Sequence, residues 1–123
     1  MIWSAIGAGL MALGVMLGAF GAHALKERLD AYSMDVYQKA VFYHFIHALG
    51  ILIVSVLFRA GALTESACTI VCALLAAGIV LFSGSLYLLA FTGSRGLGAI
   101  TPFGGISFIG AWLLLAYYLL RAK

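Results

Sequence analysis

The sequence predicts an all-α integral membrane protein with four transmembrane helices in an antiparallel bundle. All eleven charged side chains lie within 25 of the 123 residues, which leaves four uncharged runs, and 65% of the chain is hydrophobic. A bilayer core of about 30 Å needs about 20 apolar residues per helix, and a central Lys, Arg or Asp costs about 2.5 to 3.5 kcal/mol. Only 9% of the residues are charged, against about 25% in soluble domains. The charge distribution therefore favours a membrane over a soluble core.

One transmembrane domain, 1–123, is expected to contain four spans at roughly residues 2–24, 40–58, 67–91 and 101–120. The end of the first span, Ala22-His23-Ala24, has the form of a signal-peptide cleavage site. However, no Lys or Arg precedes this apolar run, and it is longer than the hydrophobic part of a signal peptide. We therefore favour a span over a cleaved leader. Lys and Arg divide four to three between the two membrane faces, a bias too small to predict an orientation.

Small residues indicate how the helices pack. A stripe of glycines with a seven-residue repeat, which lets another helix backbone approach closely, runs along the first span at Gly7, Gly14 and Gly21, and Gly18 completes a Gly-x-x-x-Gly pair. A second stripe lies about 200° around the helix, at Ala5, Ala12 and Ala19. We therefore expect the first helix to be central, with one stripe inside the bundle and the other free to meet a second copy. Further packing contacts are expected at Gly84 and Gly104.

The connection 26–39 fits either a short amphipathic helix at the interface or a polar loop. Ser33 or Asp35 is expected to cap the second helix. Aromatic side chains near the predicted interfaces are typical of membrane belts; they are Trp3, Tyr32, Tyr37, Tyr117 and Tyr118.

Two shorter connections complete the predicted topology. Residues 59–65 form a turn into the third helix, and the glycine-rich segment 92–98 separates the third helix from the fourth. Thr101 is expected as the N-cap of the fourth helix, with Pro102 at its first position. We expect the third and fourth helices to form a tight hairpin.

A polar cluster is expected in the leaflet next to the first and third connections. Ionisable groups inside a span are functional candidates, and neutral histidine is a common metal ligand and proton carrier. Because the first helix ends where the second begins, their histidines share this leaflet, and two of them are about 60° apart on one helix. The candidate polar site is His23, His44, His47, Ser83, Ser85, Tyr87, Arg95 and Thr101.

Several roles are compatible with these residues. Hydrogen bonding between helices is the commonest role of such residues, and no Asp, Glu or Cys on the same face supplies a further metal ligand. We expect no metal, no cofactor and no enzymatic activity. The favoured function is a structural or interaction role with membrane lipids and in a homo-oligomer. The alternative is a transporter or channel for a small solute, proton or metal ion, and a haem or quinone enzyme comes third. Nucleic acid is not expected as a partner, because the positive charges form no continuous stripe.

Four sequence blocks resemble a known family. They are GAFGAHAL at 18–25, YHFIHALG at 43–50, SGSLY at 83–87 and GAITPFGG at 98–105. In this order they are similar to the bacterial family named domain of unknown function 423, also called uncharacterised protein family 0382, over nearly the whole chain. The resemblance implies a small four-span protein of the bacterial inner membrane, the plasma membrane, and it brings no activity or substrate.

Overall fold

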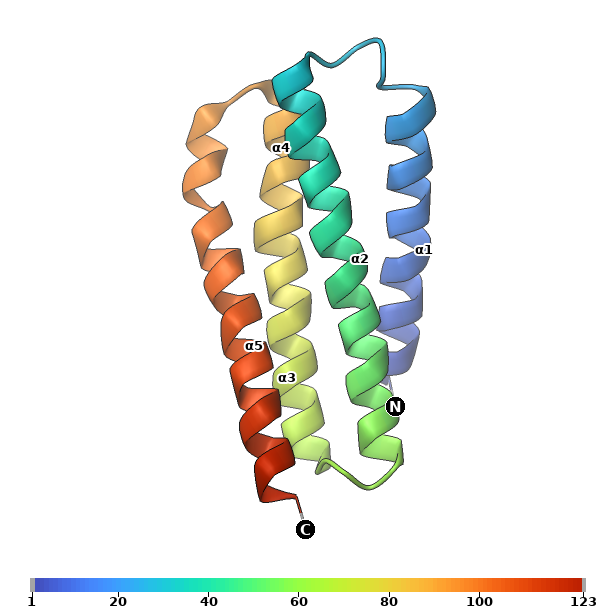
Figure 1. Cartoon of the computed structure of the whole chain (residues 1–123), viewed down its shortest axis with the longest axis vertical. Coiled ribbons are helices and arrows are strands. Elements are labelled where there is room, and N and C mark those ends of the chain that lie inside the picture. The colour runs from blue at the N-terminus through green and yellow to red at the C-terminus, as the bar shows by residue number, and fades with distance from the viewer. Residues whose placement is uncertain (1, 123) are drawn as a thin grey trace.

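The computed structural model describes residues 2–122; Met1 and Lys123, the two ends of the expected domain, lie outside the described residues. Four helical columns stand in an antiparallel bundle (Figure 1). They are formed by α1 (Ile2–His23), α2 (Ala31–Arg59), α3 (Glu65–Gly78), the π-helical turn η1 (Ile79–Ser83), α4 (Gly84–Thr92), the 3₁₀ turn η2 (Arg95–Ala99) and α5 (Thr101–Arg121). The third column is α3, η1 and α4 in succession. All four columns are long and apolar enough to cross a membrane, which confirms the predicted fold class.

The bundle is organised around α2 rather than α1. α2 packs against α1 on one side and against α3, η1 and α4 on the other, whereas α1 packs mainly on α2 and stands at one edge of the bundle (Figure 1). The expectation that the first helix is central is therefore wrong. The physical reason is that small residues allow a close approach without requiring one. Four of the five largest fully buried side chains belong to α2, namely Tyr37, Ile51, His44 and Val54; the fifth, Leu75, belongs to α3.

The two small-residue stripes of α1 have different surroundings. Its three heptad glycines are buried against α2. A Cβ atom added at Gly21 would lie 2.4 Å from the Tyr37 ring, and one at Gly14 would lie 3.1 Å from the ring of Phe45. Each glycine thus makes room for a large side chain of α2. The alanine stripe, by contrast, is exposed along the outer face of α1.

The third and fourth spans form the tight hairpin that the sequence predicts. A Cβ atom at Gly104 would lie 2.3 Å from the backbone nitrogen of Phe82, and one at Gly78 would lie 2.3 Å from the Phe108 ring. The backbones of η1 and α5 therefore meet without intervening side chains. Gly84 differs from this pattern: a Cβ there would meet only the carbonyl oxygen of Ile79, at 3.9 Å, in its own turn. The expected packing contact at Gly84 is thus absent.

The second helix begins nine residues before the expected span. Asp30 is its N-cap, and its carboxylate accepts a hydrogen bond of 2.7 Å from the backbone N–H of Ser33. Residues 31–39 are therefore the first turns of α2, rather than a separate interfacial helix or a loop, and neither Ser33 nor Asp35 is the cap. Charged residues mark where the hydrocarbon ends, but the helix continues past that level, where Asp35 and Lys39 form an exposed ion pair of 3.0 Å.

The remaining turns lie close to the positions predicted from the sequence. α2 ends at Arg59 and α3 begins at Glu65, with Thr64 as the N-cap. Gly93, at φ 69°, ends α4 in a left-handed conformation that favours glycine. Pro102 lies in the first turn of α5, as predicted, but the N-cap of that helix is Ile100 rather than Thr101.

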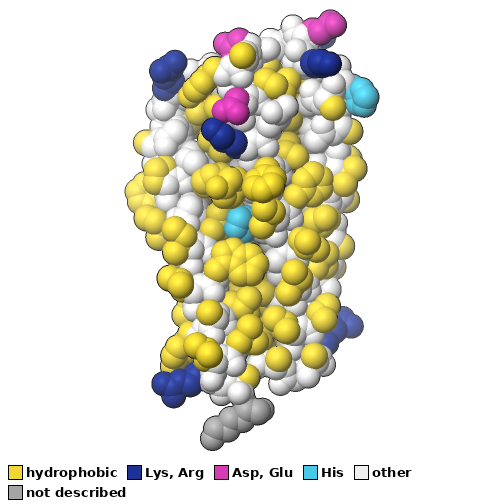
Figure 2. Space-filling model, in the orientation of Figure 1, with side chains coloured by type: hydrophobic (Ala, Val, Ile, Leu, Met, Phe, Trp, Pro, Cys, Tyr) yellow, Lys and Arg dark blue, Asp and Glu magenta, His cyan; other side chains and the backbone are white. Residues whose placement is uncertain are grey.

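The surface carries an apolar belt between two charged ends. Figure 2 shows hydrophobic side chains over the middle of one face, with Lys, Arg, Asp and Glu gathered towards the ends. Two arginines lie over exposed tyrosine rings at 5.4 Å, Arg95 over Tyr32 and Arg121 over Tyr117. Tyr37 is only 1% exposed and faces the interior. Its predicted place in the interfacial belt is therefore wrong.

Candidate functional site

His44 joins three helices through both nitrogens of its ring. The side chain is 1% exposed. Its Nε2 lies 2.7 Å from the carbonyl oxygen of Leu10 in α1, and its Nδ1 lies 2.9 Å from the hydroxyl of Tyr87 in α4. A carbonyl can only accept, so Nε2–H donates to Leu10 and Nδ1 accepts from the Tyr87 hydroxyl. This neutral tautomer uses the whole hydrogen-bonding capacity of the ring inside the bundle.

His47 points to another side of α2. Its Nδ1–H donates to the carbonyl oxygen of Tyr43 at 2.7 Å, one turn back. The imidazole stacks on the Phe108 ring of α5, with centroids 3.5 Å apart and planes 13° apart, and Trp112 lies beside it at 5.9 Å. Nε2 makes no hydrogen bond within residues 2–122. Because no fully buried side-chain nitrogen or oxygen in that range lacks a partner, this nitrogen reaches the surface.

The serines of the third span bond to neighbouring backbone and hydroxyl groups. Ser83, in the π-helical turn, donates to the carbonyl oxygen of Ala40 in α2 at 2.8 Å. Ser85 donates to the Phe82 carbonyl at 2.9 Å, and its oxygen lies 2.6 Å from the Thr101 hydroxyl. Since the Ser85 proton is used, Thr101 donates to Ser85. Thr101 therefore links α5 to α4, and its hydroxyl does not cap α5.

The other two members of the predicted site lie outside the bundle core. His23 is exposed at the last residue of α1. It follows Gly21 by two residues, about 200° around the helix, and so points away from the face that meets α2. Arg95 is exposed on η2, over Tyr32. The eight candidate residues are thus distributed over separate contacts, and the three histidines do not converge.

No group of three His, Cys, Asp or Glu side chains in the described chain is placed to hold a metal ion.

Ser107 makes a polar contact that was not predicted from the sequence. Its hydroxyl donates to the carbonyl oxygen of Leu74 at 2.7 Å. It gives the hairpin of α3 and α5 a further polar link. Its position inside an apolar run was the available signal.

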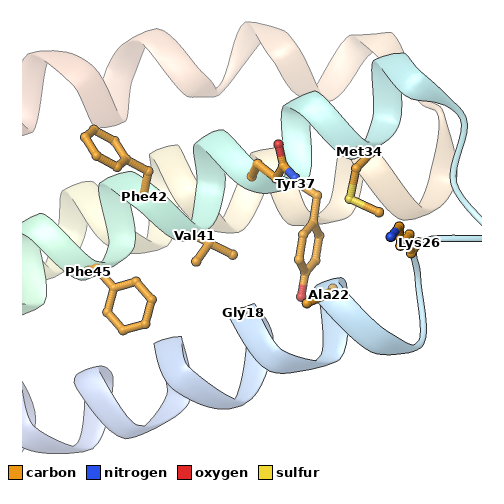
Figure 3. A pocket seen from close by; sticks show the side chains of 10 residues that line it. Gly18, Ala22, Lys26, Met34, Tyr37, Val41, Phe42 and Phe45 are labelled. Carbon is orange, nitrogen blue, oxygen red and sulfur yellow. The ribbon is translucent and has the colours of Figure 1, made fainter.

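A groove that the sequence did not predict lies between α1 and α2. Its volume is about 580 Å³, and it is lined by Gly18, Gly21, Ala22, Lys26, Met34, Tyr37, Gln38, Val41, Phe42 and Phe45 (Figure 3). None of the candidate histidines or serines lines it. A partial signal is present, because Tyr37, Phe45 and Leu52 recur every seven to eight residues on α2, opposite the glycines of α1.

Comparisons with known proteins place the chain among bacterial membrane proteins. The family model described as "Protein of unknown function (DUF423)" matches residues 17–105. A UPF0382 membrane protein of Staphylococcus haemolyticus is 46% identical over 110 residues, covering 89% of this chain and 88% of the relative. UPF0382 membrane protein YwdK of Bacillus subtilis is 46% identical over 104 residues, 84% of this chain and 83% of the relative.

A more distant relative is UPF0382 inner membrane protein YgdD of Escherichia coli, 39% identical over 109 residues, which are 89% of this chain and 82% of the relative. No solved structure matches the chain.

Proposed function

The chain belongs to the DUF423 family, called UPF0382 in its relatives, and we propose that it is a non-enzymatic protein that acts through contacts with lipids and other proteins in the bilayer. It is a multi-pass protein of the plasma membrane, the inner membrane in bacteria that have two. Its apolar belt is the surface available for these contacts.

The observation that carries the proposal is the bonding of the polar groups inside the spans. A transport path needs hydrated polar groups that can exchange partners with a passing solute or proton. In this bundle His44 uses both ring nitrogens, and Ser83 and Ser85 donate to backbone carbonyls. These bonds hold helices together, which is the structural role of polar residues in membrane interiors.

The placement of the potential catalytic groups also supports a non-enzymatic role. His44 and Tyr87 form one hydrogen-bonded pair of suitable groups, and neither lines the groove between α1 and α2. A substrate held there would not meet a base or nucleophile of this pair.

Self-association is part of the proposal. The exposed alanine stripe of α1 presents a face of small residues to the lipid, and such a face allows a second helix to approach closely. Because α1 stands at the edge of the bundle (Figure 1), this face is open to another copy of the chain.

Proton and ion flux into vesicles tests the proposal against the transport alternative. The full chain is reconstituted into vesicles that contain a pH-sensitive or metal-sensitive dye, and the flux is measured under an imposed gradient. We expect the flux of protein-free vesicles. His47 is the matched probe, since its Nε2 is the one imidazole nitrogen of the two buried histidines without a hydrogen bond. Flux above background that is lost in His47→Ala would establish transport and overturn the proposal.

A further inference from the structure

The groove between α1 and α2 lies in one leaflet and runs from the headgroup level into the hydrocarbon. Lys26, in the first connection, lies at its outer end, and Phe45 lies deeper along α2 (Figure 3). Met34 and Phe45 are eleven residues apart on one helix, a depth of about 16 Å. The groove therefore has the length and direction of a lipid acyl chain in its own leaflet.

The shape of the groove follows from the glycines of α1. Gly18 and Gly21 contribute no side chains, so the wall on that side is backbone and the methyl group of Ala22. The Tyr37 ring crosses from α2 to α1 at the level of Gly21, and its hydroxyl donates to the carbonyl oxygen of Leu17. Because this hydrogen bond fixes the ring between the two helices, the groove is part of the folded bundle.

The lining of the groove is apolar except near its outer end. Val41, Phe42 and Phe45 form the deep part, while Lys26 and Gln38 supply polar groups near the first connection. Among the described residues the ion pair is Asp35 with Lys39, and Lys26 has no carboxylate partner. The other charged residues of this loop are Glu27, Arg28 and Asp30, which sum to −1. The Asp30 carboxylate accepts a hydrogen bond from Ser33 as the N-cap of α2. The ammonium at the mouth is free to bind an anion.

We propose that this groove binds one acyl chain of an anionic phospholipid, whose phosphate pairs with Lys26. The occupant follows from charge complementarity and from the position of the groove. The apolar inner part of the groove lies at the level of the lipid acyl chains. A basic side chain at the headgroup level, here Lys26, favours anionic over zwitterionic lipid. The proposal rests on the interaction role proposed above and names the lipid class and its site.

Native mass spectrometry of the purified full chain tests the proposal. The protein in detergent is titrated with an equimolar mixture of phosphatidylglycerol and phosphatidylcholine, and the lipids that remain bound are identified. We expect one phosphatidylglycerol to be retained preferentially, by about fivefold, the effect of one basic residue near a membrane surface. Lys26→Gln should abolish this preference but leave binding of either lipid, whereas Arg28→Gln, a matched change outside the groove, should leave the preference unchanged.

A second pair of variants tests the apolar part of the groove. Ala22 lines the groove and is exposed, so Ala22→Leu should fill it and reduce retention of both lipids. Ala116→Leu, on the exposed face of α5 and outside the groove lining, should bind lipid as the wild type does. Melting of the helical circular-dichroism signal shows whether each variant is folded, and Lys26→Gln supplies an independent test because its side chain lies outside the core.

The outcomes separate this proposal from the broader one. Lipid retention that is unchanged in Ala22→Leu, or an unchanged headgroup preference in Lys26→Gln, overturns the groove site while leaving a general lipid-interaction role intact. A lipid-free dimer that Ala22→Leu dissociates would place a second copy in the groove and also overturn the site. Failure of the broader role is seen instead as ion flux in the vesicle assay.

Discussion

The Tyr87 hydroxyl donates a hydrogen bond of 2.9 Å to Nδ1 of His44, between the third span and the second. The second ring nitrogen of His44 continues this connection to the carbonyl oxygen of Leu10 in α1. One imidazole thus links three of the four spans. In hydrocarbon no water can replace these hydrogen-bond partners. The two hydrogen bonds of His44 are therefore expected to stabilise the bundle.

The coupling between His44 and Tyr87 is measurable in a double-mutant cycle. Tyr87→Phe removes the donor, and His44→Phe leaves the tyrosine hydroxyl without its acceptor; each should lower the free energy of unfolding. We expect a coupling energy of about 0.6 to 1.7 kcal/mol, the range for hydrogen bonds between membrane helices. Unfolding in mixed micelles of increasing denaturing-detergent content gives the four free energies. Strictly additive effects would mean that the bond contributes no net stability.

Replacement of His47 by phenylalanine should be tolerated much better than the same change at His44. Phenylalanine keeps a flat ring against Phe108, and the lost hydrogen bond is to a carbonyl within the same helix. The free energy of unfolding should fall by less than about 1.5 kcal/mol, the usual limit for an exchange that keeps side-chain volume, and by less than in His44→Phe. The same detergent titration compares His47→Phe with His44→Phe. Equal losses in the two variants would indicate that Nε2 of His47 has a partner important for stability.

Gly104 should be the glycine of α5 most sensitive to substitution. A Cβ there would lie 2.3 Å from the Phe82 nitrogen, a backbone atom that moves only if the helices separate. Gly104→Ala should therefore cost about 1 to 3 kcal/mol, the range for overpacking. Gly110→Ala is the matched control, because a Cβ at that position has no atom within 4 Å. Similar unfolding free energies for the two variants would contradict the tight hairpin.

The four apolar helices could be predicted from the sequence because bilayer thickness and charge cost act on every residue. The start of α2 could not, since Asp35 and Lys39 mark the end of the hydrocarbon and not the end of the helix. The cap signal was nevertheless present, because Asp30 precedes Ser33 by three residues, the spacing of a side-chain N-cap. The absence of charges indicates which residues lie in the hydrocarbon. The residue at which the helix begins is indicated instead by its capping pattern.

The candidate site was predicted less well, because side chains in the same leaflet can point towards different neighbouring helices. His44 and His47 are about 60° apart on α2, and that rotation is enough to direct one towards α1 and α4 and the other towards Phe108 of α5. The neighbours of α2 decide what each ring meets. Residue types and spacing identified polar groups of interest, but the partners depend on the order of helices around α2, which the glycine stripe of α1 did not reveal.

Self-association through the alanine stripe of α1 should depend on small side chains. Ala12 lies in the middle of that stripe and is exposed, so Ala12→Leu should keep a second helix from approaching closely. We expect wild-type dimers and Ala12→Leu monomers in the same detergent, measured as molar mass by light scattering. Ala116→Leu, on the exposed face of α5, is the control and should remain dimeric. A monomeric wild type, or dimers of Ala12→Leu, would contradict this contact.

The N-cap of α2 should weaken in acid. The backbone N–H of Ser33, and secondly its hydroxyl, hold the pKa of the Asp30 carboxyl below its ordinary value of 3.8. Because the folded pKa is the lower one, the stabilising contribution of the carboxylate is fully present above pH 3.8 and is lost as the pH falls through the folded value. The amide chemical shift of Ser33 in detergent micelles should titrate with a midpoint below 3.8. In Asp30→Asn, which can still cap the helix but does not ionise, that titration should disappear; a wild-type midpoint at or above 3.8 would mean that the hydrogen bond does not favour the carboxylate.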